Sequence, residues 1–147
     1  MLDLKIVCSN EKYLPKYANE TDACMDLKIV VPEEKVLIAP YTQKVFSTGC
    51  KFQIPEDSVM LVYPRSSTGF KLNLMLSNST GIIDSGYRDE VKLALYNFGD
   101  RAVELVDGQR IAQLVIQKRP KINLIQVEDN EEFREGNRGG GIGSTGK

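Results

Sequence analysis

Arg65, Ser66 and Ser67 form the first group of residues in this 147-residue chain that could do chemistry. They lie within residues 64–69, where a helix of one or two turns is predicted to begin. Free backbone N–H groups and the helix dipole favour an anion at a helix N-terminus, and a guanidinium adds a forked cationic donor. An anion-binding site and an ordinary capped turn are equally consistent with these residues.

Asp84 is the candidate acid–base residue. It follows the apolar pair Ile82 and Ile83 inside residues 78–91, which are predicted to form a strand, a turn and a hairpin. A carboxylate there could be partly desolvated and act as a base, although a turn-capping Asp is the commoner situation. The sequence contains no histidine, which excludes Ser-His-Asp, Cys-His and His-ligated metal mechanisms. Acid–base work therefore falls to carboxylates, Tyr or Lys, with a hard cation on oxygen ligands.

Gln113 and the C-terminal residues are further candidates for binding a ligand. Gln113 interrupts an apolar run, so its amide is either satisfied by the fold or directed at a ligand. Residues 136–147 hold half of the chain's 12 glycines. Converging backbone N–H groups there, with Arg138 and the hydroxyls of Ser144 and Thr145, would suit a phosphate. A solvated tail is the simpler alternative.

The elements that must position these residues are mainly strands. Runs rich in β-formers are separated by turn residues and are expected at 2–8, 25–31, 36–38, 44–47, 58–63, 90–96, 102–106, 111–116 and 122–127. The one expected helix covers residues 66–71. This spacing of short strands is typical of an all-β barrel or a jelly-roll-like double sheet. We expect a single β domain at residues 1–135 and a flexible glycine-rich arm at 136–147.

Charge and cysteine content limit the partners. Nineteen Lys and Arg balance 20 Asp and Glu, so no whole-protein basic surface for nucleic acid or membrane exists. No apolar run approaches the roughly 18 residues of a membrane span. Cys8, Cys24 and Cys50 are odd in number and contain no C-x-x-C pair, which predicts buried, reduced thiols. We therefore expect a soluble, intracellular, cytoplasmic protein.

Taken in order, these segments resemble the five motifs of the trimeric dUTPase (deoxyuridine 5'-triphosphate nucleotidohydrolase) family. The corresponding segments are residues 23–27, 64–69, 81–88, 108–114 and 138–146. The resemblance covers nearly the whole chain. It implies the family's distorted β-barrel, jelly-roll-like fold with at most one short helix. It also implies a homotrimer in which each site is shared between subunits and the C-terminal arm comes from a neighbour. An arm that folds onto its own subunit is the alternative.

The resemblance implies a reaction: hydrolysis of dUTP to dUMP and pyrophosphate, which limits uracil in DNA and supplies dUMP for thymidylate synthesis. Asp84 would activate the water that attacks the α-phosphate, with Mg2+ chelated by the phosphates and Asp26 touching the ion at most through water. Arg65 and Arg138 would neutralise phosphate charge. The other implied substrate-binding residues are Ser66, Ser67, Asn78, Gly81, Ile83, Tyr87, Lys92, Gln113, Ile142, Gly143, Ser144 and Thr145.

Three of these implied roles are specific. Tyr87 would pack against the deoxyribose, and uracil would be read by backbone groups near Lys92 and by Asn78. Gln113 would contact a phosphate or the attacking water. The sequence departs from the family pattern where Ile142 replaces the Phe that stacks on the base, and where Asp89 replaces a common Gly.

Two other functions compete with this interpretation. The dCTP deaminases share the fold and carry a catalytic Glu at the position where this chain has Ala94, so deamination would lack its proton carrier. A regulatory protein on the same scaffold could bind dUTP without turning it over.

Overall fold

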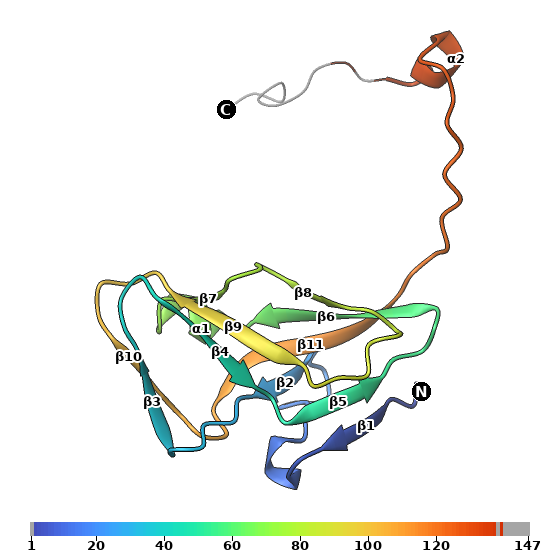
Figure 1. Ribbon diagram of the computed structural model, residues 1–147. Coiled ribbons are helices and arrows are strands. Elements are labelled where there is room, and N and C mark those ends of the chain that lie inside the picture. Colours follow the sequence, from blue (N-terminus) through green and yellow to red (C-terminus); the bar gives the residue numbers. More distant parts are fainter. Residues whose placement is uncertain (1, 138, 140–147) are drawn as a thin grey trace.

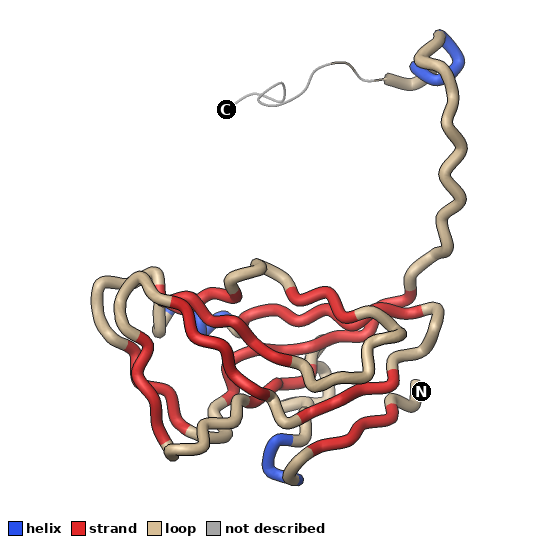
Figure 2. Tube along the Cα trace, in the orientation of Figure 1, coloured by secondary structure: helices blue, strands red, loops and turns tan. Residues whose placement is uncertain are grey.

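The computed structural model describes residues 2–137 and 139 and contains mostly short strands (Figures 1 and 2). The elements in chain order are β1 (Lys5–Cys8), the 3-10 helix η1 (Glu11–Tyr13), β2 (Met25–Lys28), β3 (Lys35–Ile38), β4 (Gln43–Ser47), β5 (Cys50–Gln53), β6 (Ser58–Pro64), α1 (Ser66–Phe70), β7 (Leu74–Leu76), β8 (Gly81–Ile83), β9 (Lys92–Asn97), β10 (Val103–Val106), β11 (Arg110–Lys118) and α2 (Glu131–Arg134). The predicted all-β fold is therefore confirmed.

The strands form four antiparallel sheets. The largest has the order β2-β11-β6-β8, a second has the order β4-β9-β7, and β1-β5 and β10-β3 are two-stranded. Within residues 2–137 and 139 these sheets do not close into one hydrogen-bonded barrel. They are held together by apolar side chains that alternate inward along each strand, as in β9, where Leu93 and Leu95 are buried and Lys92 is exposed.

The interior is a single cluster to which every sheet contributes. Its fully buried side chains include Leu27, Ile38, Met60, Leu76, Leu95 and Leu114. Because the four sheets bury their inner faces against the same cluster, each depends on the others for stability. None of the helices in the described part of the chain has the length and apolar character needed to cross a membrane.

Two expectations about the elements were wrong. Residues 122–127 do not form a strand: they run away from the sheets as an extended segment (Figure 1), and Leu124 is 90% exposed. A strand needs a neighbouring backbone, and the described part of this chain supplies none there. The structure also contains a second α-helix, α2, where at most one helix was expected. Its first turn is stabilised locally, because the Asn130 side chain accepts a hydrogen bond from Phe133 N.

The cysteines only partly match expectation. All three are reduced, and Cys50 is buried, but Cys8 and Cys24 are only half-buried. The division into a domain of residues 1–135 and an arm of residues 136–147 stays a prediction. Residues 119–137, which follow the central strand β11, are exposed throughout.

Candidate active site

A cationic cavity of about 440 Å³ lies where β6 ends and β11 begins. Four positively charged side chains and the turn before β11 line it: Lys28, Arg65, Lys71, Arg110, Gly108 and Gln109, with Ser67 and Leu72. Gly108 has a φ of +75°, a left-handed conformation that favours glycine in this tight turn. This concentration of positive charge suits a ligand with several negative charges, such as a chain of phosphates.

Asp26 holds two of these cations in place. Arg65 Nε lies 2.7 Å from Asp26 Oδ1, and an Arg110 terminal nitrogen lies 3.0 Å from Oδ2. Asp26 lies on β2 and is buried, while the two arginines come from the ends of β6 and β11. The carboxylate therefore fixes the positions of both guanidinium groups beside the cavity.

A bulge in β11 shapes the same region. Arg110 pairs with Lys28 and Ala112 pairs with Leu27, so Ile111 is an extra residue on β11. Bulges bend a strand and re-aim its side chains, and they are frequent next to functional sites. Here the bulge lets Ile111 and Ala112 both be buried while Arg110 turns to the cavity.

Helix α1 is attached to β11 rather than capped by its own residues. Arg65 occupies the N-cap position, and no side chain caps the helix there. The Thr68 hydroxyl donates to Ile111 O at 2.6 Å, and Arg65 N donates to the same oxygen at 3.3 Å. The simple alternative of a capped turn therefore does not describe this segment, and Ser66 and Ser67 lie in the first turn of a helix that tertiary contacts hold.

Gln113 lies between β2 and β6, in register with Asp26 on one side and Tyr63 on the other. Its Nε2 donates to Pro64 O at 3.1 Å. The amide is therefore at least partly satisfied within the fold, by the carbonyl of the residue before Arg65, and it lies opposite Asp26 across the sheet. Its contact with a phosphate or a water stays a prediction.

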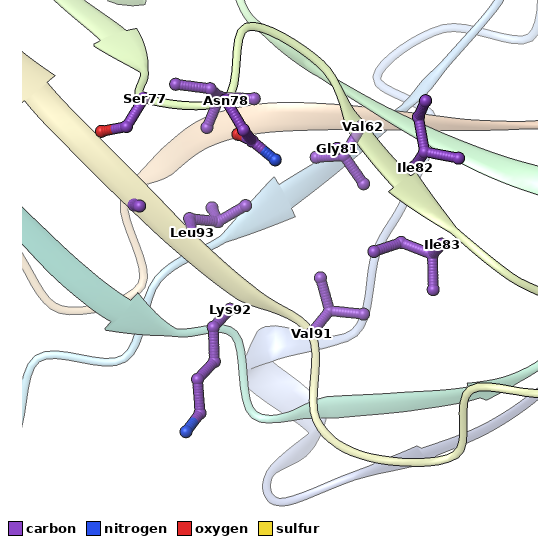
Figure 3. A pocket seen from close by; sticks show the side chains of 11 residues that line it. Val62, Ser77, Asn78, Gly81, Ile82, Ile83, Val91, Lys92 and Leu93 are labelled. Carbon is purple, nitrogen blue, oxygen red and sulfur yellow. The ribbon is translucent and has the colours of Figure 1, made fainter.

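A second cavity, of about 360 Å³, opens between β8 and β9 (Figure 3). Apolar side chains form its wall, and backbone and polar groups surround its mouth: Val62, Leu76, Ile82, Ile83, Val91, Leu93 and Ala94, with Ser77, Asn78, Gly81 and Lys92. β8 is the edge strand of its sheet. β9 is the middle strand of another sheet, but β7 pairs with it only from Leu95 onward, so among the residues that the structure describes the backbone at the start of β9 has no strand partner on that side. Edges of this kind offer backbone donors and acceptors of fixed polarity to a flat ligand such as a nucleobase.

Asn78, Gly81, Ile83 and Lys92 all line this cavity, and their contact with a substrate stays a prediction. Figure 3 shows the Asn78 amide directed toward the space between the two strands, whereas the Lys92 side chain extends away from it. Lys92 therefore lines the cavity through its backbone and not through its ammonium group. Close packing favours glycine at position 81, because an added Cβ would lie 3.1 Å from the Val62 Cβ on the paired strand β6.

Asp84 and Tyr87 lie in the loop that leaves this cavity. Tyr87 N donates to Asp84 O at 3.1 Å, and the Tyr87 hydroxyl donates to Glu90 O at 2.9 Å, which fixes the ring. The Asp84 side chain is exposed. The partial desolvation considered for Asp84 is therefore absent in the isolated chain and would have to come from a ligand or another chain.

Asp84 and Arg65 lie toward opposite ends of β6. Met60 pairs with Ile83 and Val62 with Gly81, so Asp84 follows β8 near the beginning of β6, whereas Arg65 follows its end. At about 3.3 Å per residue, residues 59 and 65 of one extended strand are about 20 Å apart. Within one chain, the candidate base and the candidate phosphate-binding arginine are therefore too far apart to contact the same phosphate.

The comparisons with known proteins identify the family. A family model described as dUTPase matches residues 10–146. The chain belongs to the dUTPase family.

Two bacterial relatives named deoxyuridine 5'-triphosphate nucleotidohydrolase align with nearly the whole length of this dUTPase-family chain. The protein of Clostridium tetani is 36% identical over 146 residues, 99% of this chain and 97% of the relative. That of Clostridium kluyveri is 40% identical over 139 residues, 94% and 93% of the two chains.

Solved dUTPase structures share the fold. A mutant dUTPase of Staphylococcus bacteriophage 80alpha with dUpNHpp has a TM-score of 0.85 at 26% identity and covers all of both chains. A mutant dUTPase from phage phi11 of S. aureus has a TM-score of 0.77 at 25% identity, covering 88% of this chain and 99% of that one. It is described as revealing the coordination of a structural Mg(II) ion.

Sequence reasoning did not single out three of the residues that line the cationic cavity, namely Lys28, Lys71 and Arg110. Arg110 lies in the segment 108–114, for which only Gln113 was considered as a ligand-binding residue. A basic residue just after α1 was the available signal for Lys71. Arg138, Ile142, Gly143, Ser144 and Thr145 lie outside the described residues.

Asp107 anchors the turn that carries Gly108 and Arg110. Its carboxylate accepts from Val31 N at 2.9 Å and from the Tyr13 hydroxyl at 2.8 Å, and it pairs with Lys12 at 2.5 Å. Burial alone would raise the pKa of Asp107, but these hydrogen bonds outweigh it and lower the pKa from 3.8 to about 2.

We expect the free energy of unfolding of Asp107→Asn to depend less on pH in the acidic range than that of the wild-type protein. The folded-state pKa of Asp107 lies below its ordinary value, so its contribution is full above about pH 4 and is lost as pH falls toward 2. The variant should be less stable by about 2 kcal/mol at pH 7. Urea unfolding across this range should show the difference between the two proteins shrinking steadily below about pH 4. A difference of constant size would contradict this account.

Proposed function

We propose that this chain hydrolyses dUTP to dUMP and pyrophosphate by attack of a water on the α-phosphate. The observation that carries the proposal is the coexistence of two complementary cavities in a chain that belongs to the dUTPase family. The cavity between β8 and β9 would take the deoxyuridine, and the cationic cavity would take the phosphates. The product dUMP would serve thymidylate synthesis, and removal of dUTP would limit uracil in DNA, in the cytoplasm.

Asp84 is the proposed general base. A carboxylate is ionised at neutral pH and can orient a water and accept its proton. The exposed position of Asp84 at the end of β8, directly after a residue that lines the nucleoside cavity, supports this role. Gln113 would contact the attacking water or a phosphate oxygen.

Charge neutralisation would be shared by Arg65, Ser66 and Ser67 on the phosphates, with Arg138, Ser144 and Thr145 from the C-terminal arm. Arg110 and Lys71 are added to this set because they line the same cavity as Arg65. Preorganised cations stabilise the charge that develops on a leaving pyrophosphate. The ion pair with Asp26 keeps Arg65 and Arg110 in place before the substrate arrives.

The donor set fits a Mg2+ ion held mainly by the substrate. The described residues contain no cluster of three His, Cys, Asp or Glu side chains that could hold a metal, and both Asp26 oxygens already face arginines. Magnesium keeps several waters and is commonly bound through phosphates. Asp26 would therefore reach the ion at most through water. When bound, the ion supplies positive charge that offsets the triphosphate.

Base and sugar selection would rest on the nucleoside cavity and its loop. Backbone groups of β8 and of the start of β9, with Asn78, would pair with uracil, while the amino group of cytosine would leave buried groups unpaired. Gly81 and Ile83 would form the wall beside the base, and Ile142 and Gly143 would cover it. The Tyr87 ring, held by its bond to Glu90, would pack against the deoxyribose and exclude a 2'-hydroxyl.

A homotrimer with shared sites would bring the separated groups together. Asp84 and Arg65 of one chain are about 20 Å apart, too far to act on one phosphate chain. A site that combines the nucleoside cavity of one subunit with the cationic cavity of another removes this difficulty. The arm after residue 135 would then reach a neighbouring subunit.

A substrate panel of dUTP, dCTP, dTTP and UTP with Mg2+ tests the proposal through product identity. We expect dUMP and pyrophosphate from dUTP, with the other nucleotides at least about 10³-fold slower. Deamination of dCTP would instead support the sister family, although Ala94 lines the cavity where that family carries its Glu. Tight dUTP binding without any product would support a purely regulatory role. One phage relative is described as a dUTPase controlling transfer of virulence genes.

A further inference from the structure

Cys8 and Cys50 lie directly opposite each other in the two-stranded sheet β1-β5. The antiparallel register pairs Cys8 with Cys50. Ser9 N donates to Gly49 O at 2.8 Å, so the next pair along is hydrogen-bonded. Hydrogen-bonded and non-hydrogen-bonded pairs alternate along an antiparallel ladder. The two cysteines therefore form a non-hydrogen-bonded pair.

The backbone of Cys50 confirms this assignment. Its N–H donates to Thr48 Oγ1 at 3.3 Å, and its carbonyl accepts from Val91 N at 3.0 Å, so neither group is directed at Cys8. In such pairs the Cα atoms are about 4.5 Å apart and the side chains approach most closely. Disulfides need a Cα separation of about 4.4–6.8 Å. A bond between these sulfurs requires little movement of the backbone.

The two thiols differ in access to solvent. Both side chains point to the same face of the sheet, where Cys50 is fully buried and Cys8 is half-buried. Burial, followed by a hydrogen bond with the Cys8 thiol, raises the pKa of Cys50. A dissolved oxidant therefore reaches Cys8 first, and Cys50 is placed to react with Cys8 afterwards.

We propose that Cys8 and Cys50 are a reversible redox pair that a small-molecule disulfide, such as oxidised glutathione, converts to an intramolecular disulfide. The Cys8 thiol loses its proton, and its sulfur attacks one glutathione sulfur, which releases one glutathione and forms a mixed disulfide. The Cys50 thiol then gives up its proton to water, which is the slow step because this thiol is buried, and its sulfur attacks Cys8 Sγ. The second glutathione leaves as a thiolate and takes up a proton. The two cysteines are oxidised by two electrons, and one oxidised glutathione is reduced to two thiols.

The disulfide would fasten β1 to the strand that supports the Asp84 loop. Next to Cys50, the Gly49 N–H donates to the Glu90 carboxylate at 2.6 Å, and Val91 N donates to Cys50 O. The bond would also close a loop of about 40 residues, which restricts the unfolded chain. We expect the oxidised protein to melt about 5 °C or more above the reduced protein.

The test is incubation of the folded full chain with oxidised glutathione, followed by alkylation and non-reducing peptide mapping. Wild type and the matched control Cys24→Ser should both yield a Cys8–Cys50 linked peptide, a higher melting temperature, and complete reversal by dithiothreitol. Cys8→Ser should yield no link and no temperature shift. Cys50→Ala should stop at glutathione on Cys8.

Three outcomes would overturn the proposal. The first is a linked peptide that contains Cys24. The second is glutathione that stays on Cys8 in wild type without transfer to Cys50. The third is a wild-type protein that remains fully reduced under conditions that oxidise a dithiol peptide of similar sequence. Cys8→Ser changes only a half-buried side chain, so this variant should fold. The test can therefore be decided with Cys8→Ser even if Cys50→Ala does not fold.

Discussion

Asp84→Asn should abolish turnover of dUTP while leaving binding of the nucleotide nearly intact. The amide has the size of the carboxylate but accepts a proton far less readily, so loss of a general base should lower kcat by about 10³-fold or more. The Asp84 side chain is exposed, and the hydrogen bond from Tyr87 N goes to its backbone carbonyl. The melting temperature of the variant should therefore remain within about 2 °C of wild type.

Pyrophosphate release and calorimetric binding of a non-hydrolysable dUTP analogue separate the two effects. Asp89→Asn is the matched control, because Asp89 is an exposed carboxylate of the same loop with no assigned role. It should keep nearly full activity. If Asp84→Asn retained activity within tenfold of the control, Asp84 would not be the base.

Asp26→Asn should damage both stability and catalysis, because it leaves two arginines close together without their shared anion. The Asp26 side chain is 12% exposed, and its partners Arg65 and Arg110 are 26% and 50% exposed. Removing one member of a largely buried ion pair costs about 3 kcal/mol, reduced here by the exposure of Arg110. The arginines would also lose their fixed positions, so kcat/KM should fall by about 10²-fold.

Urea unfolding and steady-state kinetics measure these two losses, with Asp57→Asn as the control. Asp57 also pairs with a cation, Lys118, but both side chains are more than 60% exposed. Such a surface pair should contribute less than about 1 kcal/mol. Adding Arg110→Gln to Asp26→Asn should recover part of the lost stability by removing one of the facing charges. An Asp26→Asn variant as stable as the Asp57→Asn control would contradict the assigned role.

Much of the fold can be predicted from short segments of the sequence taken one at a time. Runs of β-forming residues between turn residues identified the strands β2, β6, β9 and β11, and the segment after Pro64 identified α1. These predictions held because each depends on side chains within one segment. The three-residue strand β8 lies within residues 78–91, where a strand was predicted, but β7 was not predicted, since three residues are too few to establish a period.

The failure at residues 122–127 has a different cause. Ile122, Ile125 and Val127 have strong β-propensity, and yet each is more than 60% exposed and outside every sheet. Propensity states only that a residue fits a pleated surface. Whether a strand forms depends on a partner backbone, and none of residues 2–137 provides one there.

The sequence by itself determined which chemistry is available: no histidine, one carboxylate at the end of a strand, and basic and hydroxyl residues after another. Only the tertiary structure decided how these groups meet. It set Asp26 between Arg65 and Arg110, placed Cys8 beside Cys50, and separated Asp84 from Arg65 along β6. The sequence specifies which residue types each segment contains. The register between strands that are distant in the chain depends instead on how all the sheets bury their apolar faces together.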